Sequence, residues 1–203
     1  MPTEMPFLNN TFCDDEPDDK GAKDDPLLIK LLKTRAVIIS DPIDARLTKA
    51  VLTQLLLLDA DDPEAEIRIF INSPGGSADS GFSIFDMIRF VRPPVKTICA
   101  GLVASAAAMI LLAAKKENRV AFPNSRILLH QPSMSFQGSA ADIEITAQQI
   151  LKLKERANQI IAQETGHPLD RIGKDTNRDH WMDAEEALEY NLISKIISSA
   201  NEI

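Results

Sequence analysis

Short apolar runs rich in β-branched residues alternate along this chain with longer segments of helical spacing. The short runs predict strands, and they lie at residues 35–40, 67–72, 95–100, 119–122 and 126–130. The longer segments predict a helical turn or two at 27–32, helices at 42–60 and 78–91, and a further helix that begins near Ser105. Such alternation is typical of an α/β layered fold with mostly parallel pairing, which is the fold class we expect.

The N-terminal segment differs from the rest of the chain. Residues 1–26 include DDEPDD and KDD but few apolar residues, so they cannot bury enough surface to offset the entropy of ordering. We expect them to form an acidic mobile arm, and residues 27–203 to form one domain. Within that domain, Asp41 is predicted to cap the helix that runs to about Ala60, and Pro42 to open it.

The longest helical pattern runs from Ser139 to about Gly166. Ile143, Ile150 and Ala157 recur at intervals of seven residues, which places them on one face of a helix. At 1.5 Å per residue this helix would be roughly 40 Å long, comparable with the whole domain. Two interpretations stay open: an amphipathic helix that packs on its own domain, or one that contacts another subunit.

Composition and charge narrow the function classes. The chain of 203 residues is 44% hydrophobic and 26% charged, which is typical of a globular protein. Its formal net charge of -8 disfavours nucleic acid as a partner, because phosphate binding needs a positive surface. Cys13 and Cys99 are too few and too distant for a disulfide framework, so we expect free thiols. The N-terminal MPTEMPFLNN lacks the pattern of a signal peptide, and we expect the protein in the cytoplasm.

The most apolar segment, residues 98–114, contains one polar side chain, Ser105. A membrane span needs about 20 apolar residues, so this shorter run, rich in Ala and Gly, indicates a strand that enters a buried helix. The amides of a first helical turn are unpaired and can stabilise an oxyanion. The alternative is a serine tolerated within a small-residue helix. Ser105 does not match the nucleophile-elbow motif, because Val103 and Ala107 stand where that motif needs glycines.

Two further motifs offer groups for the same chemistry. SPGG at residues 73–76 follows a strand and exposes amides that could form half of an oxyanion hole; the alternative is a plain tight turn. His130 ends the apolar strand RILLH, where it could accept a serine proton and return it to a leaving amine. The alternative is a structural histidine bonded to the backbone. His167 and His180 lie in polar contexts and are interpreted as surface residues.

A serine–histidine pair needs a carboxylate to orient the imidazole and stabilise its cation. Spacing does not choose among the four aspartates downstream, which are Asp170, Asp175, Asp179 and Asp183. No paired Cys or His residues stand at zinc-ligand spacing, so we expect no metal site.

Four blocks in order carry a resemblance to a known family: INSPGG (71–76), the run around Ser105, PNSRILLHQP (123–132) and DTNRD (175–179). Together they closely resemble ClpP, the family of proteolytic subunits of ATP-dependent Clp proteases (peptidase family S14), over about residues 27–198. The resemblance implies a ClpP/crotonase-like layered fold of repeated β-β-α units. It also implies a protruding helical segment, the handle, over about residues 131–165.

The resemblance implies a serine endopeptidase that hydrolyses unfolded polypeptides inside a double-ring chamber. By the resemblance, Ser105 is the nucleophile, His130 the general base and acid, and Asp179 the orienting carboxylate. Gly76 and Ala106 would donate the amides of the oxyanion hole. No cofactor is expected. The family's partners would be further copies of the chain in two stacked heptameric rings, or mixed rings with a paralogue, and an AAA+ unfoldase such as ClpX or ClpA.

The chain departs from the usual family pattern in three places. Ala104-Ser105-Ala106-Ala107 stands where family members usually have Ala-Ser-Met-Gly, and Ala107 is expected to restrict the turn. Residues 1–26 do not resemble the usual axial loop, and residues 26–29 replace a segment that normally contains an aromatic residue. One alternative is therefore a weakly active or structural paralogue that needs a partner ClpP subunit. Another is a crotonase-like acyl-CoA binder, which would have no use for the serine–histidine pair.

Overall fold

The computed structural model describes residues 26–203 apart from residue 134, so the predicted acidic arm lies outside the described part except for Pro26. In that part seven strands form one sheet. They are β1 (Ala36–Ile39), β2 (Ile67–Ser73), β3 (Val95–Ala104), β4 (Arg119–Ala121), β5 (Arg126–Leu129), β6 (His180–Met182) and β7 (Lys195–Ile196). All pairs are parallel except β5 with β6, so the expected α/β class with mostly parallel pairing is confirmed.

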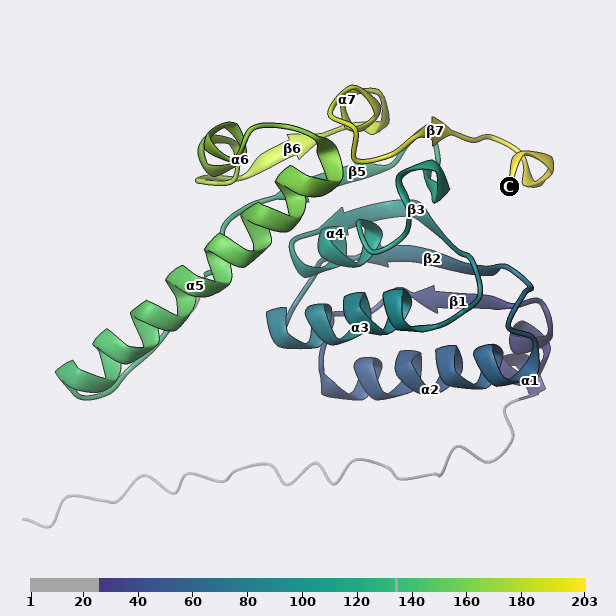
Figure 1. The fold of residues 1–203 in the computed structure, drawn as a ribbon, viewed down its shortest axis with the longest axis horizontal. Helices are drawn as coiled ribbons and strands as arrows, with labels where there is room; N and C mark the ends of the chain where they lie inside the picture. Colours follow the sequence, from purple (N-terminus) through teal and green to yellow (C-terminus); the bar gives the residue numbers. More distant parts are fainter. Residues whose placement is uncertain (1–25, 134) are drawn as a thin grey trace, which may run out of the picture.

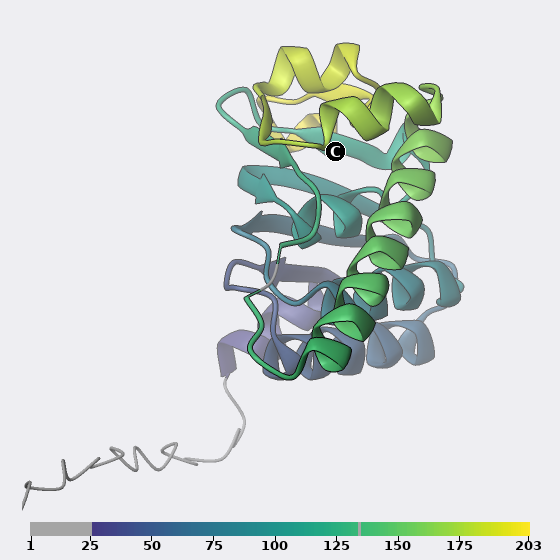
Figure 2. The same cartoon turned by 90° about the vertical axis from the view of Figure 1, so that its left-hand side faces the viewer.

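The helices alternate with these strands. They are α1 (Pro26–Lys33), α2 (Ala45–Asp61), α3 (Ala78–Phe90), α4 (Ala106–Leu111), α5 (Ala140–Thr165), α6 (Leu169–Asp175) and α7 (Ala184–Glu189), with short 3-10 turns at Lys116–Asn118 and Ala200–Glu202. Helices α2, α3 and α4 cover one face of the sheet (Figures 1 and 2). The core lies between these layers, where Ile67, Ile69 and Ile71 of β2 are fully buried. Burial of every second residue is what a strand with one covered face requires.

Strand β3 pairs with two different strands on the same side, and the candidate site lies near the point where the pairing changes. Its first half, Thr97–Cys99, pairs with β4, whereas its second half, Leu102–Ala104, pairs with β5. Strand β5 therefore begins a second stretch of sheet, which β6 continues in antiparallel register. The ends of β3 and β5 reach the same edge, where sites collect in open α/β folds.

Helix α5 leaves the body of the molecule at its N-terminal end (Figure 1). Ser139 caps it by accepting a hydrogen bond from the Asp142 amide, and Gly166 ends it in the left-handed conformation at φ 78°. Its buried residues, Asn158, Ile161 and Thr165, all lie in its second half. The predicted bounds of this helix are thus confirmed, and its first half is left largely without a partner in the single chain.

The start of α2 corrects one prediction. Asp44 caps this helix by accepting from the Leu47 amide, so neither Asp41 nor Pro42 does what we expected. The chain stays extended through Ile43, because its amide donates to the Gly75 carbonyl (2.8 Å) and its carbonyl accepts from the Ser77 amide (2.7 Å). This bridge to the glycine turn holds the backbone out of the helical region.

Candidate active site

Ser105 lies between the end of β3 and the start of α4, in a backbone conformation that serines rarely adopt. Its φ of 56° and ψ of −121° place it outside the allowed basins of an L-residue. Its amide donates to the Leu128 carbonyl of β5 (3.0 Å), and its carbonyl accepts from the Ala108 amide (2.9 Å). Strain of this kind persists only where the surroundings over-determine it, and it is common at catalytic residues.

Two glycines from outside the turn make room for it. A side-chain carbon at Gly75 would lie 2.6 Å from the Ala104 carbonyl oxygen and 2.8 Å from the Ser105 Cβ, and Gly75 itself has φ +90°. A side-chain carbon at Gly81 would lie 3.0 Å from the Ala106 Cβ. Position 75 therefore needs glycine for close packing against the Ser105 turn, and Gly81 packs tightly against the residue that follows Ser105.

The chain thus builds a strained strand-to-helix turn without the glycines of the nucleophile-elbow motif. Ala107 is fully buried as the second residue of α4, where alanine is the most favourable helix former. The expectation that Ala107 restricts the turn is therefore wrong. Gly75 and Gly81 supply the clearance, and only the tertiary fold reveals that they face Ser105.

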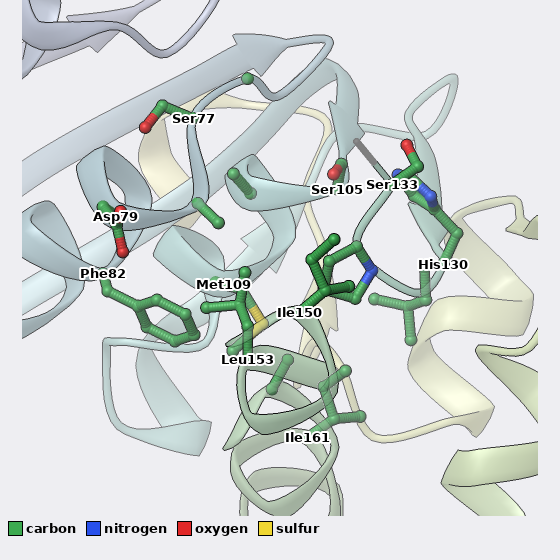
Figure 3. A pocket seen from close by; sticks show the side chains of 16 residues that line it. Ser77, Asp79, Phe82, Ser105, Met109, His130, Ser133, Ile150, Leu153 and Ile161 are labelled. Atoms are coloured by element: carbon green, nitrogen blue, oxygen red, sulfur yellow. The ribbon is translucent and has the colours of Figure 1, made fainter. Parts of the chain in front are cut away.

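A cavity of about 380 Å³ opens beside Ser105 and brings together residues from four segments (Figure 3). Ser105 and His130 both line it, although they are 25 residues apart in the sequence. Its apolar walls come from Phe82 of α3, Met109 of α4 and one face of α5. The structure therefore places the predicted serine and histidine at the same cavity.

His130 follows the last residue of β5, and its neighbour Gln131 is held from two sides. The Gln131 amide donates to the Thr176 carbonyl (2.6 Å), its side chain donates to the Asn177 carbonyl (2.8 Å), and Lys154 of α5 donates to its side-chain oxygen (2.9 Å). These bonds fix the strand end between α5 and the turn that precedes β6. Within the described residues, no hydrogen bond joins the His130 ring to Ser105 or to Asp179.

Asp179 is exposed and lies outside the cavity lining, but it directly precedes β6, the strand that pairs with β5. Strands β5 and β6 pair in antiparallel register with Leu129 opposite His180. His130 directly follows Leu129, and Asp179 directly precedes His180, so both residues adjoin the same end of this strand pair. The strand pairing therefore brings the predicted carboxylate to the same edge of the sheet as the imidazole.

The other three candidate aspartates have different surroundings. Asp175 accepts a hydrogen bond from the Tyr190 hydroxyl (2.7 Å) and pairs with Arg171. Asp183 caps α7 through the Glu186 amide (2.8 Å). Asp170 is exposed in the first turn of α6. Of the four, Asp179 is the one that adjoins the same end of the β5–β6 pair as His130.

Two backbone amides beside Ser105 are available to a substrate. Gly76 and Ala106 both line the cavity. Ala106 is the first residue of α4, so its amide has no partner within the helix. In the described part of the chain, neither amide donates a hydrogen bond to another residue. These are the two donors that the resemblance implied for an oxyanion hole.

Sequence reasoning missed most of the cavity wall. The lining residues of α5 are Ile150, Leu153, Ala157 and Ile161. Their spacing was visible in the seven-residue recurrence of Ile150 and Ala157, but the pattern did not show what this face contacts. Asp79 of α3 also lines the cavity and was not singled out.

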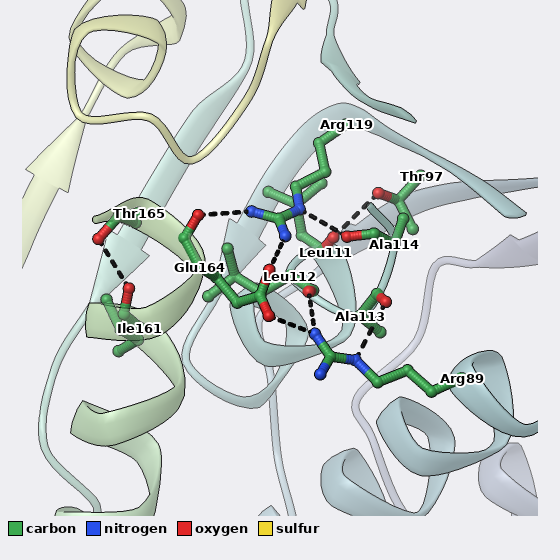
Figure 4. Close-up of polar contacts among 10 residues, drawn as sticks. All are labelled: Arg89, Thr97, Leu111, Leu112, Ala113, Ala114, Arg119, Ile161, Glu164 and Thr165. Carbon is green, nitrogen blue, oxygen red and sulfur yellow. Dashed lines mark hydrogen bonds and ion pairs between the residues drawn. The ribbon is translucent and has the colours of Figure 1, made fainter. Parts of the chain in front are cut away.

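A cluster of charged side chains around the buried Arg119 joins two walls of this cavity (Figure 4). Arg119 is fully buried, pairs with Glu164 near the end of α5, and donates to the Ala114 carbonyl (2.8 Å) beyond α4. Arg89 of α3 pairs with the same carboxylate (2.5 Å) and donates to the Ala113 carbonyl (3.3 Å). Burial lowers the pKa of Arg119, and the Glu164 charge opposes this shift. The cluster therefore ties the C-terminal side of the serine-bearing helix to α5.

Other sequence expectations have mixed outcomes. Cys99 is a buried free thiol whose pKa is raised to about 11 by burial, whereas Cys13 lies outside the described residues. His167 is not a plain surface residue, because it packs edge-on against Tyr190 with ring centroids 4.5 Å apart.

Within residues 26–133 and 135–203, no group of His, Cys, Asp or Glu is arranged to hold a metal. No helix in that same part of the chain is long and apolar enough to cross a membrane.

Comparison with known proteins supports the family resemblance that the sequence motifs indicated. A model of the Clp protease family matches residues 19–200. ATP-dependent Clp protease proteolytic subunit 2 of Treponema denticola is 47% identical over 199 residues, which cover 98% of each chain. The subunit 3 of Rhizobium etli is 48% identical over 194 residues, covering 94% of this chain and 99% of that protein.

The fold is also that of a solved relative. The structure of a ClpP1 mutant from Listeria monocytogenes matches with a TM-score of 0.80 and 43% sequence identity, covering 86% of this chain and 98% of that one. This match confirms the ClpP-like layered fold predicted from the sequence. With a family match over most of its length and relatives close to half identical, this chain belongs to the Clp protease family.

Proposed function

We propose that the chain is a serine endopeptidase subunit that hydrolyses unfolded polypeptides. The observation that carries the proposal is the shared cavity: Ser105, on a strained turn, and His130, at a strand end, line the same apolar space. Asp179 is the third member, and the β5–β6 register supports its role beside His130.

In the proposed mechanism, His130 takes the proton from the Ser105 hydroxyl as its oxygen attacks the substrate carbonyl. The Gly76 and Ala106 amides donate to the negative oxygen that forms. His130 then gives the proton to the leaving amine, and the peptide C–N bond breaks. A water molecule then attacks the acyl-enzyme carbonyl while His130 takes its proton, and His130 returns that proton to the Ser105 oxygen as the ester bond breaks. Throughout, Asp179 holds the imidazole in the useful tautomer.

Assembly would complete this arrangement. The first half of α5 and the segment before it expose large apolar side chains, including Phe136 (48%), Ile145 (59%) and Leu151 (64%). Burial of such residues drives association. We infer that this half of α5 is the handle that joins two heptameric rings, and that the contact brings the His130 ring into line with Ser105.

The proposed partners and cellular location rest on membership of the Clp protease family. The proposed partners are further copies of this chain in two stacked heptameric rings, or mixed rings with a paralogue. An AAA+ unfoldase such as ClpX or ClpA would supply unfolded polypeptides to the chamber. The proposed location is the cytoplasm.

A second candidate is a subunit that becomes active only with a ClpP paralogue. It is favoured by the absence of a hydrogen bond between His130 and Ser105 in the described residues. The relatives are named proteolytic subunit 2 and proteolytic subunit 3, and this numbering indicates more than one such subunit in those organisms. The two candidates share the same nucleophile and differ in what aligns it.

Labelling with a fluorophosphonate probe tests the proposal. The assembled particle is expected to carry the probe on Ser105, located by peptide mass, and not on Ser77 or Ser133, which line the same cavity. S105A should abolish both the label and peptide hydrolysis. Native mass measurement separates the candidates: a fourteen-subunit particle of this chain that cleaves peptides alone excludes the need for a paralogue. No label on Ser105, even with a paralogue present, would contradict both candidates.

A further inference from the structure

The cavity beside Ser105 contains a single carboxylate. Among the described residues that line it, Asp79 is the one acid, and no lysine or arginine lines it. The remaining lining is mostly apolar. Asp79 is exposed in the first turn of α3, three residues before Phe82, so both lie on the α3 side of the cavity (Figure 3).

The charge of Asp79 has no local counter-ion. In the described part of the chain, Asp79 forms no ion pair and its side chain accepts no hydrogen bond. The nearby cation on α5, Arg156, is already engaged. It pairs with Asp86 (3.7 Å), and its guanidinium lies 4.3 Å from the centroid of the Phe82 ring. The cavity therefore presents an uncompensated negative charge to whatever enters it.

Long basic side chains match this combination of walls and charge. Lysine and arginine bury an apolar stem while keeping a charged head in a polar or charged environment. Phe82, Met109 and Leu153 offer apolar contact for a stem. Asp79 offers an acceptor for the head. An acidic side chain would meet the same carboxylate and be repelled.

Resting on the proposed peptidase function, we propose that Asp79 sets the side-chain preference of this site. The cavity takes the side chain of the substrate residue whose carbonyl meets Ser105. It favours lysine or arginine over an uncharged side chain of equal length, and both over glutamate. Asp79 acts here on binding and not on the proton transfers.

The test compares three fluorogenic peptides that differ only in the residue before the cleaved bond: lysine, norleucine or glutamate. Norleucine keeps the apolar stem and lacks the charge. For the assembled full-length particle, kcat/KM for lysine should exceed that for norleucine by about fivefold at low salt, the upper range for one solvent-accessible charge pair. The ratio should fall as salt is added.

Two variants locate the effect. In D79N the lysine-to-norleucine ratio should fall to about one, and cleavage of the glutamate peptide should rise relative to norleucine. D170N is the control, because it removes the same charge from an exposed residue that does not line the cavity and leaves the Arg156–Asp86 pair intact. An unchanged ratio in D79N, or an equal change in D170N, would overturn the proposal.

A binding measurement separates this proposal from the proposed catalysis. The same three peptides, fluorescently labelled, are bound to the S105A particle and followed by anisotropy. The order lysine, norleucine, glutamate is expected there too, and the D79N change should remove it. If this order holds while the unmodified particle cleaves no peptide, the peptidase proposal fails and the preference stands. If cleavage occurs without the order, the preference fails alone.

Discussion

The turn that carries Ser105 and the strand end that carries His130 border one cavity but are held in place differently. The Ser105 backbone has hydrogen bonds to Leu128 and Ala108 and is packed against Gly75. At His130 the backbone is anchored through Gln131, yet the ring has no bonded partner among the described residues. We infer that the single chain holds the proposed nucleophile and its amide donors in place, and we propose that assembly aligns the His130 ring and the Asp179 carboxylate.

The largest effect is expected on the histidine side, from D179N. Loss of the orienting carboxylate should lower kcat by roughly 10⁴-fold, because the imidazole is no longer held in the useful tautomer. Asp179 is exposed and has no bonded partner in the described chain, so the melting temperature should barely change. D170N, another exposed aspartate, should leave both properties unchanged. A D179N particle with full activity would remove Asp179 from the mechanism.

On the serine side, G75A should lower both activity and stability. The new carbon would lie 2.6 Å from the Ala104 carbonyl oxygen, at a φ that L-residues rarely adopt. Strain and overpacking together should cost about 2–5 kcal/mol, and kcat should fall at least about 100-fold as the Ser105 turn shifts.

G166A is the control for this variant. Gly166 also has positive φ, but a side-chain carbon there meets nothing within 4 Å. It should therefore cost only about 1 kcal/mol, with no loss of kcat. Thermal unfolding and peptide hydrolysis measure both quantities, and equal effects of the two variants would show that Gly75 does not shape the turn.

E164A tests whether the tie between α4 and α5 matters to the serine side. It would leave Arg119 fully buried without its carboxylate, which should lower the free energy of unfolding by about 3–5 kcal/mol. D86N breaks an ion pair whose partners are both largely exposed, and should cost less than about 1 kcal/mol. Denaturant unfolding compares them. Similar costs for the two variants would show that the cluster does not hold the walls together.

The smallest effect concerns Cys99 on β3. Burial raises the pKa of this thiol from 9.0 to about 11. Above pH 9 the unfolded chain ionises the thiol while the folded chain does not, so stability is lost as pH rises from 9 to 11. The loss should approach about 2–3 kcal/mol. C99A should lose less stability than the parent between pH 8 and pH 11, and equal losses would contradict a protonated thiol in the folded state.

The long regular elements were predictable, because each buries a periodic face that the sequence shows directly. Strand β2 and helices α3 and α5 match their predicted bounds within one or two residues. Helices α6 and α7 and strands β6 and β7 were not predicted. Each is at most seven residues long and depends on tertiary contacts more than on its own periodicity.

In the candidate site too, some residues could be predicted from the local sequence and others depend on tertiary contacts. Ser105 was found because it is the one polar side chain within an apolar run, and His130 because it ends another apolar run. The start of α2 was predicted wrongly, because the bridge between Ile43 and Gly76 is a long-range contact that overrides a local capping signal. The roles of Gly75, Gly81 and Asp79 depend on which side chains face them across the fold, and no local pattern encodes that.

The separation between the Ser105 hydroxyl and the nearest ring nitrogen of His130, in a crystal structure of the assembled particle, tests the central claim most directly. We predict that the two atoms lie within hydrogen-bond reach, about 2.6–3.2 Å, while Ser105 keeps its positive φ. A particle that hydrolyses peptides with these atoms far apart in every subunit, or with Ser105 in an ordinary conformation, would contradict the account.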